Sequence, residues 1–168
     1  LEKIKSLGPA FLEKGTITAA TSSPISIGAS AILISSRTFA EKNSLRIRAT
    51  IKGRSVVGVD WRRMGMGPLP ATEKVLKKLN MTMDQIDVIE LNEAFAAQSL
   101  YVIKNGKWDT NKINKNGGAI ALGHPLGCSG ARIITTLVNI MEQQGSKTGL
   151  ATMCIGTGQG IATVLERN

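Results

Sequence analysis

Six short runs of apolar and β-branched residues predict strands. They cover 15–20, 28–36, 45–59, 86–91, 149–156 and 160–166. The run at 28–36 is strongly apolar and is expected to be buried. The run at 45–59 carries Arg48, Lys52 and Arg54, which are expected to face water at a sheet edge.

Apolar residues spaced three and four positions apart predict helices between these strands. The clearest are 70–79, with Val75, Leu76 and Leu79 on one face, and 129–144, which ends at Gly145. Shorter helical segments are expected at 1–13, 38–43, 82–85 and 92–103, the first as a short helix or an ordered tail. Strands and helices alternate and end in a hairpin. This order predicts an α/β fold in which helices cover a mixed, largely parallel sheet.

The composition is typical of a folded globular domain, with 42% hydrophobic and 20% charged residues in a chain of 168. No apolar run approaches the ~20 residues that span a bilayer. Residues 1–15 are amphipathic and do not form a signal peptide, so no membrane partner is expected and the cytoplasm is the default compartment. The chain starts at Leu1 and not at Met, which suggests a piece of a longer polypeptide.

The net charge of +9 requires an explanation. The basic residues are spread from Lys3 to Lys115, with only one Tyr and two Trp among them, so the interleaving of aromatic and basic residues that binds bases is absent. A nucleic-acid partner is therefore disfavoured. A phosphorylated small ligand or an acidic partner subunit explains the charge as well.

The candidate chemistry lies in three glycine-rich places. His124, the only histidine, and Asn92 are each expected at a turn from a strand to a helix, and Cys154 precedes the loop 156–160. A lone histidine is more often structural than catalytic, but a thiol, an imidazole and a carboxamide in such loops suit acyl-thioester chemistry. The loop lacks GxGxxG spacing and a following helix, which argues against a dinucleotide site. Cys128 and Cys154 have neither disulfide nor zinc spacing, and no metal site is expected.

The amino-acid sequence of these segments resembles that of the thiolase family. The matching motifs are Asn-Glu-Ala-Phe-Ala-Ala-Gln from Asn92, the segment from Asn116 to Arg132 around His124, and the segment from Gly149 through Cys154 to Ala162. Thr21-Ser-Ser and Cys128 look most like the degradative 3-ketoacyl-CoA thiolases of bacterial fatty-acid oxidation. The resemblance implies the C-terminal half of a duplicated fold. Residues 1–44 would be the tail end of the first repeat and 45–168 the C-terminal domain.

The resemblance also implies roles for individual residues. His124 matches the histidine that activates the nucleophile and contributes to an oxyanion hole, and Asn92 matches the residue that orients a water there. Cys154 matches the acid/base for the acetyl carbanion, and the N–H of Gly156 belongs to a second oxyanion site. Three further residues fall at positions near the pantetheine or acyl chain: Ser23, Met64 and Phe95. Coenzyme A is the implied co-substrate of a 3-ketoacyl-CoA, with no permanently bound cofactor.

Two departures from the family are visible. The nucleophilic cysteine and its motif are absent from these residues, and Cys128, four positions after His124, is a poor substitute. Pro24 and Ile27 stand where the family usually has glycine and aspartate, which puts the neighbouring substrate contacts in doubt.

Three hypotheses therefore compete. The chain is part of a working thiolase, an inactive fragment that binds CoA or contacts other subunits, or a basic nucleic-acid binding module. The family implies a homo-oligomer, and its degradative members associate with a hydratase/dehydrogenase subunit.

Overall fold

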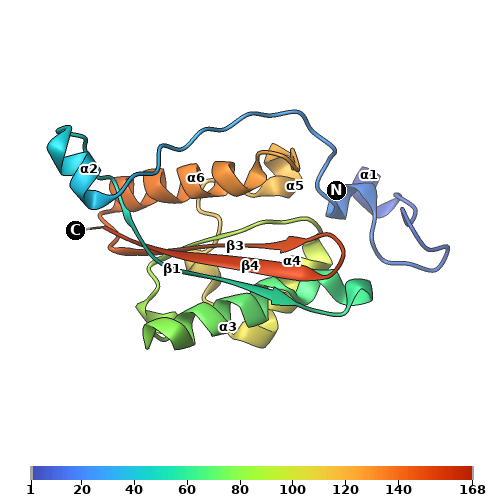
Figure 1. Ribbon diagram of the computed structural model, residues 1–168. Coiled ribbons are helices and arrows are strands. Elements are labelled where there is room, and N and C mark those ends of the chain that lie inside the picture. The colour runs from blue at the N-terminus through green and yellow to red at the C-terminus, as the bar shows by residue number, and fades with distance from the viewer. Residues whose placement is uncertain (1, 168) are drawn as a thin grey trace.

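A single four-stranded sheet lies at the centre of the computed structural model, which describes residues 2–167 (Figure 1). The strands are β1 (Thr50–Gly58), β2 (Val88–Leu91), β3 (Thr148–Ile155) and β4 (Gln159–Glu166), in the spatial order β1-β4-β3-β2. In Figure 1, α5 and α6 lie on one face of this sheet and α3 and α4 on the other. The α/β prediction is confirmed.

The prediction that the sheet is largely parallel is wrong for the described residues. Only β2 and β3 are parallel, whereas β4 is antiparallel to both β1 and β3. The loop 156–158 is too short for a crossover, so β3 and β4 form a hairpin. The β2–β3 connection contains three helices, α4 to α6, and this longer path allows parallel pairing.

Most predicted helices are present with shifted bounds, the segment at 1–13 is helical only at its start, and α5 was not predicted. Their bounds are α1 (Glu2–Lys5), α2 (Arg37–Lys42), α3 (Pro68–Leu79), α4 (Ala96–Gly106), α5 (Ala119–Leu122) and α6 (Ser129–Gln144). The 3-10 turns are η1 (Ala19–Thr21), η2 (Trp61–Met66), η3 (Met83–Gln85) and η4 (Thr110–Lys112). Pro68 occupies the first turn of α3, and Gly145 ends α6 with a φ of 68°.

Each face of the sheet has its own hydrophobic core. Alternate strand residues point to opposite faces, so Leu150 packs with Val75 of α3, while Ala151 packs with Leu137 of α6. The two cores hold the ends of β2 and β3 in place, and the candidate chemistry follows directly after those ends.

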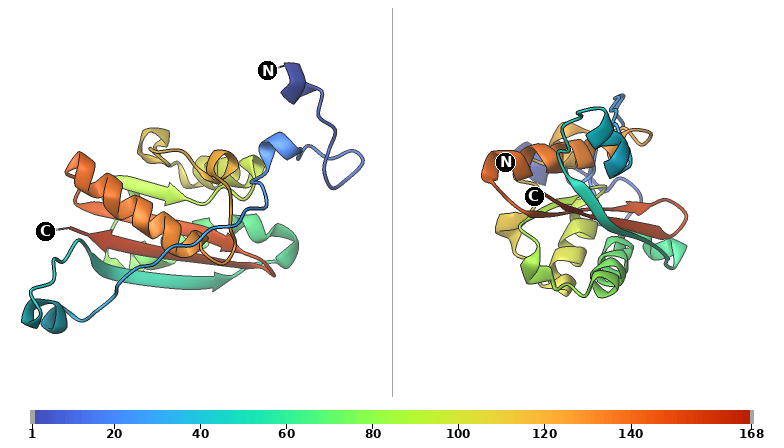
Figure 2. Two further views of the ribbon diagram at one scale, coloured as in Figure 1. Left: turned by 90° about the horizontal axis from the view of Figure 1, so that it is seen from above. Right: turned by 60° about the vertical axis from the view of Figure 1, so that its left-hand side comes forward.

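The predicted strands at 15–20 and 28–36 are absent from the described residues. Residues 28–36 run as an extended segment along the outside of α6 (Figure 2), where Leu33 is 81% and Ile34 70% exposed. A strand forms only when a neighbour accepts and donates its backbone hydrogen bonds, and residues 2–167 provide none for this segment. The expected burial of this run is therefore not seen.

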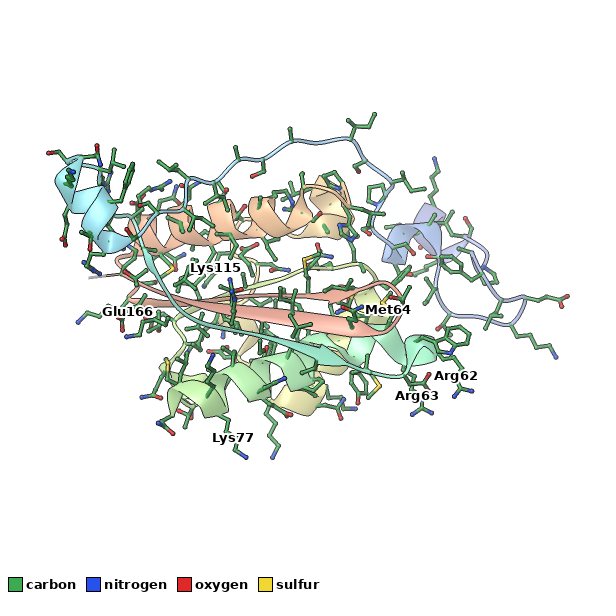
Figure 3. All side chains as sticks on the ribbon, viewed as in Figure 1. Arg62, Arg63, Met64, Lys77, Lys115 and Glu166 are labelled. Carbon is green, nitrogen blue, oxygen red and sulfur yellow. The ribbon has the colours of Figure 1, made fainter. Side chains whose placement is uncertain are left out.

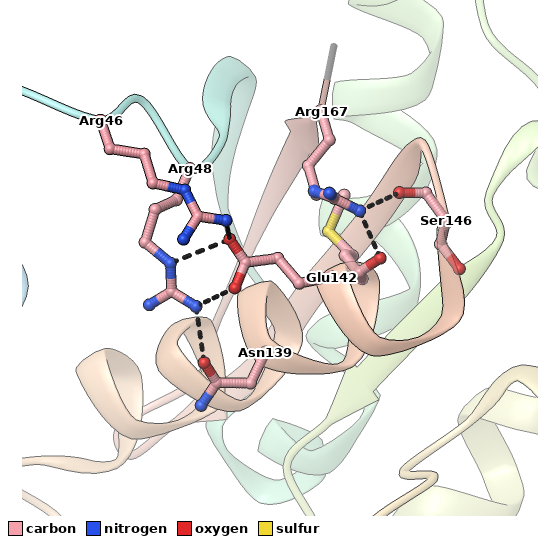
Figure 4. A network of polar contacts seen from close by, with 7 residues as sticks. Arg46, Arg48, Asn139, Glu142, Ser146 and Arg167 are labelled. Carbon is pink, nitrogen blue, oxygen red and sulfur yellow. Dashed lines mark hydrogen bonds and ion pairs between the residues drawn. The ribbon is translucent and has the colours of Figure 1, made fainter.

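A cluster of charged side chains attaches the start of β1 to the end of α6 (Figure 4). Arg46 and Arg48 both donate to the carboxylate of Glu142, and Arg167 donates to the carbonyls of Met141 and Ser146. The side chain of Glu142 is 21% exposed, and the arginine beside it lowers its pKa. Part of the positive charge therefore has a structural use.

Candidate active site

Asn92 and His124 meet at the carboxyl end of β2. The backbone N–H of Asn92 donates to the carbonyl of Thr152 at 3.0 Å, which continues the β2–β3 pairing one residue beyond β2. Its side-chain Nδ2 lies 3.3 Å from His124 Nε2. His124 itself lies between α5 and α6, so its predicted place at a strand-to-helix turn is wrong. Asn92 does follow a strand, with α4 starting at Ala96.

Hydrogen-bond geometry assigns the tautomer of His124. Ser129 Oγ donates to the carbonyl of Pro125 at 3.1 Å and lies 2.6 Å from His124 Nδ1. Asn92 Nδ2 can only donate, so His124 Nε2 accepts from it, and the proton of the neutral ring lies on Nδ1 and is donated to Ser129 Oγ. Nε2 then carries the lone pair and accepts from the Asn92 amide. The basic nitrogen of His124 is thus turned toward Asn92 and is able to take a proton.

The surroundings of His124 favour its neutral form. The ring is half-buried, and burial, assisted by the positive charge of Arg132, lowers the pKa of His124 below its ordinary value. A neutral imidazole is the form that can act as a base.

Ser129 was not recognised from the sequence, because a serine at the start of a helix is an ordinary cap. We predict that Ser129→Ala lowers kcat/KM for the proposed reaction roughly tenfold and changes the acid limb of its pH profile, since the Nδ1–H loses its acceptor. The measurement is a pH–rate profile of the full-length polypeptide that contains this chain, with the exposed Ser35→Ala as control. An unchanged profile would contradict the assignment.

Asn92 keeps a buried, unpartnered acceptor. It is 1% exposed, and its Oδ1 has no hydrogen-bond partner among the described residues. Buried carbonyl oxygens are usually satisfied by protein or ordered water. The free Oδ1 is therefore suited to hold a water molecule beside His124.

Hydrogen bonds to the side chain of Glu93, here called the brace, connect the loop that carries Asn92 with the segment that precedes His124. Its carboxylate accepts from Asn114 Nδ2 at 2.9 Å and from the backbone N–H of Ile120 at 3.2 Å. A Cβ on Gly118 would overlap this carboxylate, so a larger residue there would displace Glu93 from its partners. The brace links the loop after β2 to α5, which precedes His124. Sequence reasoning missed Asn114, whose side chain also pairs with both backbone groups of Leu91.

Cys154 and Gly156 lie at the end of β3, next to Asn92 through the paired strands. Cys154 is 5% exposed, and burial raises the pKa of its thiol. The thiol is therefore protonated and able to serve as an acid. Gly156 is exposed, and a Cβ there would meet nothing within 4 Å. Within residues 2–167 no hydrogen bond joins Cys154 to His124.

The predicted substrate contacts fall into two groups. Ser23 and Phe95 are neighbours, because Ser23 donates both N–H and Oγ–H to the carbonyl of Ala94 and Ser22 bridges Phe95. The same loop reaches His124, whose N–H donates to Pro24 at 3.3 Å. Met64 lies in η2, toward the end of the sheet that carries the β3–β4 hairpin (Figure 3).

Glu90 is a buried carboxyl in β2, two residues before Asn92. It is 2% exposed, with Oε1 unpartnered among the described residues, and burial raises its pKa to about 7 despite the opposing charge of Arg132. The folded pKa is above the unfolded one, so its contribution to stability is present below pH 4.5 and is lost as pH rises through 7.

We predict that Glu90→Gln raises the melting temperature relative to wild type at pH 8 and loses this advantage at pH 5. A carboxylate that must be buried charged is destabilising by up to about 3 kcal/mol, whereas an amide does not ionise. Thermal unfolding at both pH values checks this, with the exposed Glu73→Gln as control. The same melting difference at both pH values would contradict a titration of Glu90 between pH 5 and pH 8.

The comparison with known families decides the identity of this array. Residues 45–167 match the family described as "Thiolase, C-terminal domain", and residues 1–38 match "Thiolase, N-terminal domain". The chain belongs to the thiolase family. Asn92 just after β2, His124 between α5 and α6, and Cys154 near the end of β3 are consistent with the acyl-thioester chemistry inferred from the sequence.

The curated relatives of this thiolase chain are more than twice as long as the chain. The 3-ketoacyl-CoA thiolase of Aliivibrio salmonicida (strain LFI1238) is 59% identical over 171 residues, which cover 99% of this chain and 44% of the relative. That of Acinetobacter baumannii (strain AYE) is 58% identical with the same coverage. The chain therefore spans less than half the length of these relatives.

Solved structures show the same fold. Human mitochondrial 3-ketoacyl-CoA thiolase in complex with CoA matches with a TM-score of 0.97 and 42% identity, covering 99% of this chain and 42% of that one. Acetyl-CoA acetyltransferase of Bacillus anthracis matches with a TM-score of 0.91 and 38% identity, covering 98% of this chain and 42% of that one.

Within residues 2–167, no helix combines the length and apolar character needed to cross a membrane. In the same part of the chain, no three His, Cys, Asp or Glu side chains gather as metal ligands.

Proposed function

We propose that this chain is the C-terminal portion of a 3-ketoacyl-CoA thiolase, an acetyl-CoA C-acyltransferase of fatty-acid oxidation. The observation that carries the proposal is the Asn92–His124–Ser129 array, with a basic Nε2 and an unpartnered Asn92 Oδ1, beside the buried thiol of Cys154. One group can take a proton and the other can give one, which are the two roles that acid–base catalysis requires.

The proposed reaction has two halves. His124 takes the proton of a cysteine thiol located outside these 168 residues, and the thiolate attacks the 3-keto carbon of the substrate. The bond between that carbon and the neighbouring CH₂ breaks, and Cys154 protonates the acetyl-CoA carbanion. CoA then loses its thiol proton to a base of the site, and its sulfur takes the acyl group from the cysteine. The free cysteine thiol is thereby regenerated.

Each oxyanion requires donors. His124, which carries a proton on Nε2 after acting as base, and a water held by Asn92 would stabilise one negative oxygen, and the N–H of Gly156 another. Ser23, Phe95 and Met64 would line the path of the pantetheine arm or the acyl chain. CoA is a co-substrate, and no permanently bound cofactor is proposed.

We extend the proposal to the organisation of the protein. Residues 1–44 would complete the first repeat and 45–168 would form the C-terminal domain. The protein would act as a homo-oligomer in the cytoplasm, with a hydratase/dehydrogenase as a partner subunit. The exposed apolar residues of 28–36 support a further covering segment, because contiguous apolar residues are normally covered by another part of the protein.

The test is thiolysis of acetoacetyl-CoA by the full-length polypeptide that contains this chain. The proposal expects loss of acetoacetyl-CoA with formation of acetyl-CoA, and only when CoA is added. A folded protein that binds CoA without cleaving the substrate would favour the alternative, an inactive fragment that acts in CoA binding.

A further inference from the structure

The hairpin loop that carries Gly156 is held by η2 at two backbone contacts. At the first, the N–H of Val59 donates to the carbonyl of Gly158 at 2.8 Å. A Cβ on Gly158 would overlap the Val59 carbonyl and lie 2.8 Å from the Cα of Trp61. Gly158 also has a φ of 92°, which side chains other than hydrogen rarely tolerate. The start of η2 thus requires glycine at this point of the loop.

The second contact lies at the other end of η2. A Cβ on Gly67 would lie 2.5 Å from the carbonyl oxygen of Gln159 and 2.8 Å from the Cα of Gly160. A Cβ on Gly160 would overlap the backbone of Gly67. Two backbones approach each other here as closely as glycines allow, and a backbone cannot rotate aside as a long side chain can.

η2 is itself fixed at both ends. The carboxylate of Asp60 accepts from the backbone N–H of Arg62 at 3.0 Å and from its guanidinium, which caps the first turn. Gly67 donates to the carbonyl of Met64 at 3.0 Å and leads directly into α3, which packs on the sheet. η2 therefore brackets residues 158–160 between its two ends, with one non-helical residue, Arg63, inside it.

Gly156 lies two residues before the segment 158–160 that η2 brackets. It is exposed and has empty space around its Cα, and its two successors both have positive φ, 70° for Thr157 and 92° for Gly158. A donor that stabilises a developing oxyanion must be held in place before the reaction, because a shift of about 0.5 Å removes most of its effect. Within the loop, Thr157 Oγ1 donates to the carbonyl of Gly156, and the bracket fixes the backbone that follows at residues 158–160.

We propose that η2 positions the Gly156 N–H and the adjoining Cys154 for catalysis, with Gly67, Gly158 and Gly160 as positioning residues. This inference rests on the proposed function, in which Gly156 and Cys154 act on the substrate. The contacts are between backbones, so they act on the direction of the Gly156 N–H and not on substrate affinity.

The first test is Gly158→Ala in the full-length polypeptide, with Gly58→Ala as a matched control. Gly58 pairs with Gln159, yet a Cβ there meets nothing within 4 Å. The expected result for Gly158→Ala is a kcat for thiolysis lowered by roughly ten- to a hundredfold with KM changed less than about threefold, because an oxyanion donor acts mainly in the transition state. Gly58→Ala should keep the wild-type kcat.

A gentler variant covers the event that Gly158→Ala does not fold. Asp60→Ala removes the cap of η2 without adding an atom and is expected to lower kcat several-fold. In both variants, hydrogen–deuterium exchange of the peptide covering 154–160 should be faster than in wild type, while the exchange of β2 stays unchanged.

The readouts separate the two proposals. Wild-type-like exchange and kcat in folded Gly158→Ala and Asp60→Ala would overturn the bracket while leaving thiolysis by the wild type intact. A wild type without thiolysis would overturn the proposed function, and the catalytic role of the bracket with it. Exchange accelerated equally in Gly58→Ala would also contradict the bracket.

Discussion

Replacing His124 with alanine is expected to lower kcat/KM for thiolysis by about 10³-fold or more. A positioned general base contributes about 10²–10⁴-fold, and His124 also holds one end of the network through Ser129 and Asn92. Its lowered pKa keeps the ring neutral, so the acid limb of the wild-type profile should lie below the ordinary histidine value of 6.5. The measurement is the thiolysis rate of the full-length polypeptide from pH 5 to 9.

The control for His124→Ala is Lys78→Ala, an exposed change on α3. It should leave both the rate and the pH profile unchanged. A His124→Ala variant with wild-type activity would remove the imidazole from the mechanism, because no other histidine is present in these residues.

Cys154→Ser is expected to lower the thiolysis rate by roughly 10²–10⁴-fold while leaving the fold intact. The thiol is buried and its pKa is raised, so the group is protonated at neutral pH and can deliver a proton to the acetyl carbanion. A serine hydroxyl of nearly the same size preserves the packing but is a much weaker acid. Circular dichroism and the melting temperature should therefore match the wild type.

Cys128→Ser is the matched control, because Cys128 is the other buried thiol of the chain. It occupies the position before α6 without a side-chain capping hydrogen bond, and its sulfur packs near Gly28. The account expects its activity to be preserved. Comparable losses in both serine variants would indicate that buried thiols serve stability here and not proton transfer.

The parts of the fold that depend on local signals could be predicted from the sequence. The apolar faces of α3 and α6, the stop at Gly145 and the hairpin after β3 all follow from residues close together in the chain. Residues 28–36 show where such reasoning ends. Their apolar character predicts a strand, but a strand exists only with a partner, and the described residues contain none.

The site shows the same division. His124, Asn92 and Cys154 were found because rare residue types in glycine-rich loops carry a chemical signal. Ser129, Asn114 and Glu93 were missed as working parts, because a hydrogen bond between distant residues leaves no pattern in the sequence. Gly158 and Gly160 look like loop residues, and their close contacts with η2 are visible only in three dimensions.

The most direct test of the central claim is to map the acyl group on the enzyme. The full-length polypeptide is incubated with acetyl-CoA, digested without reducing agents that attack thioesters, and its cysteine peptides are weighed by mass spectrometry. The account predicts an acetyl group on a cysteine outside these 168 residues, with Cys154 and Cys128 unmodified. Stoichiometric acetylation of Cys154 or Cys128 would contradict it, because the attacking thiol would then lie within this chain.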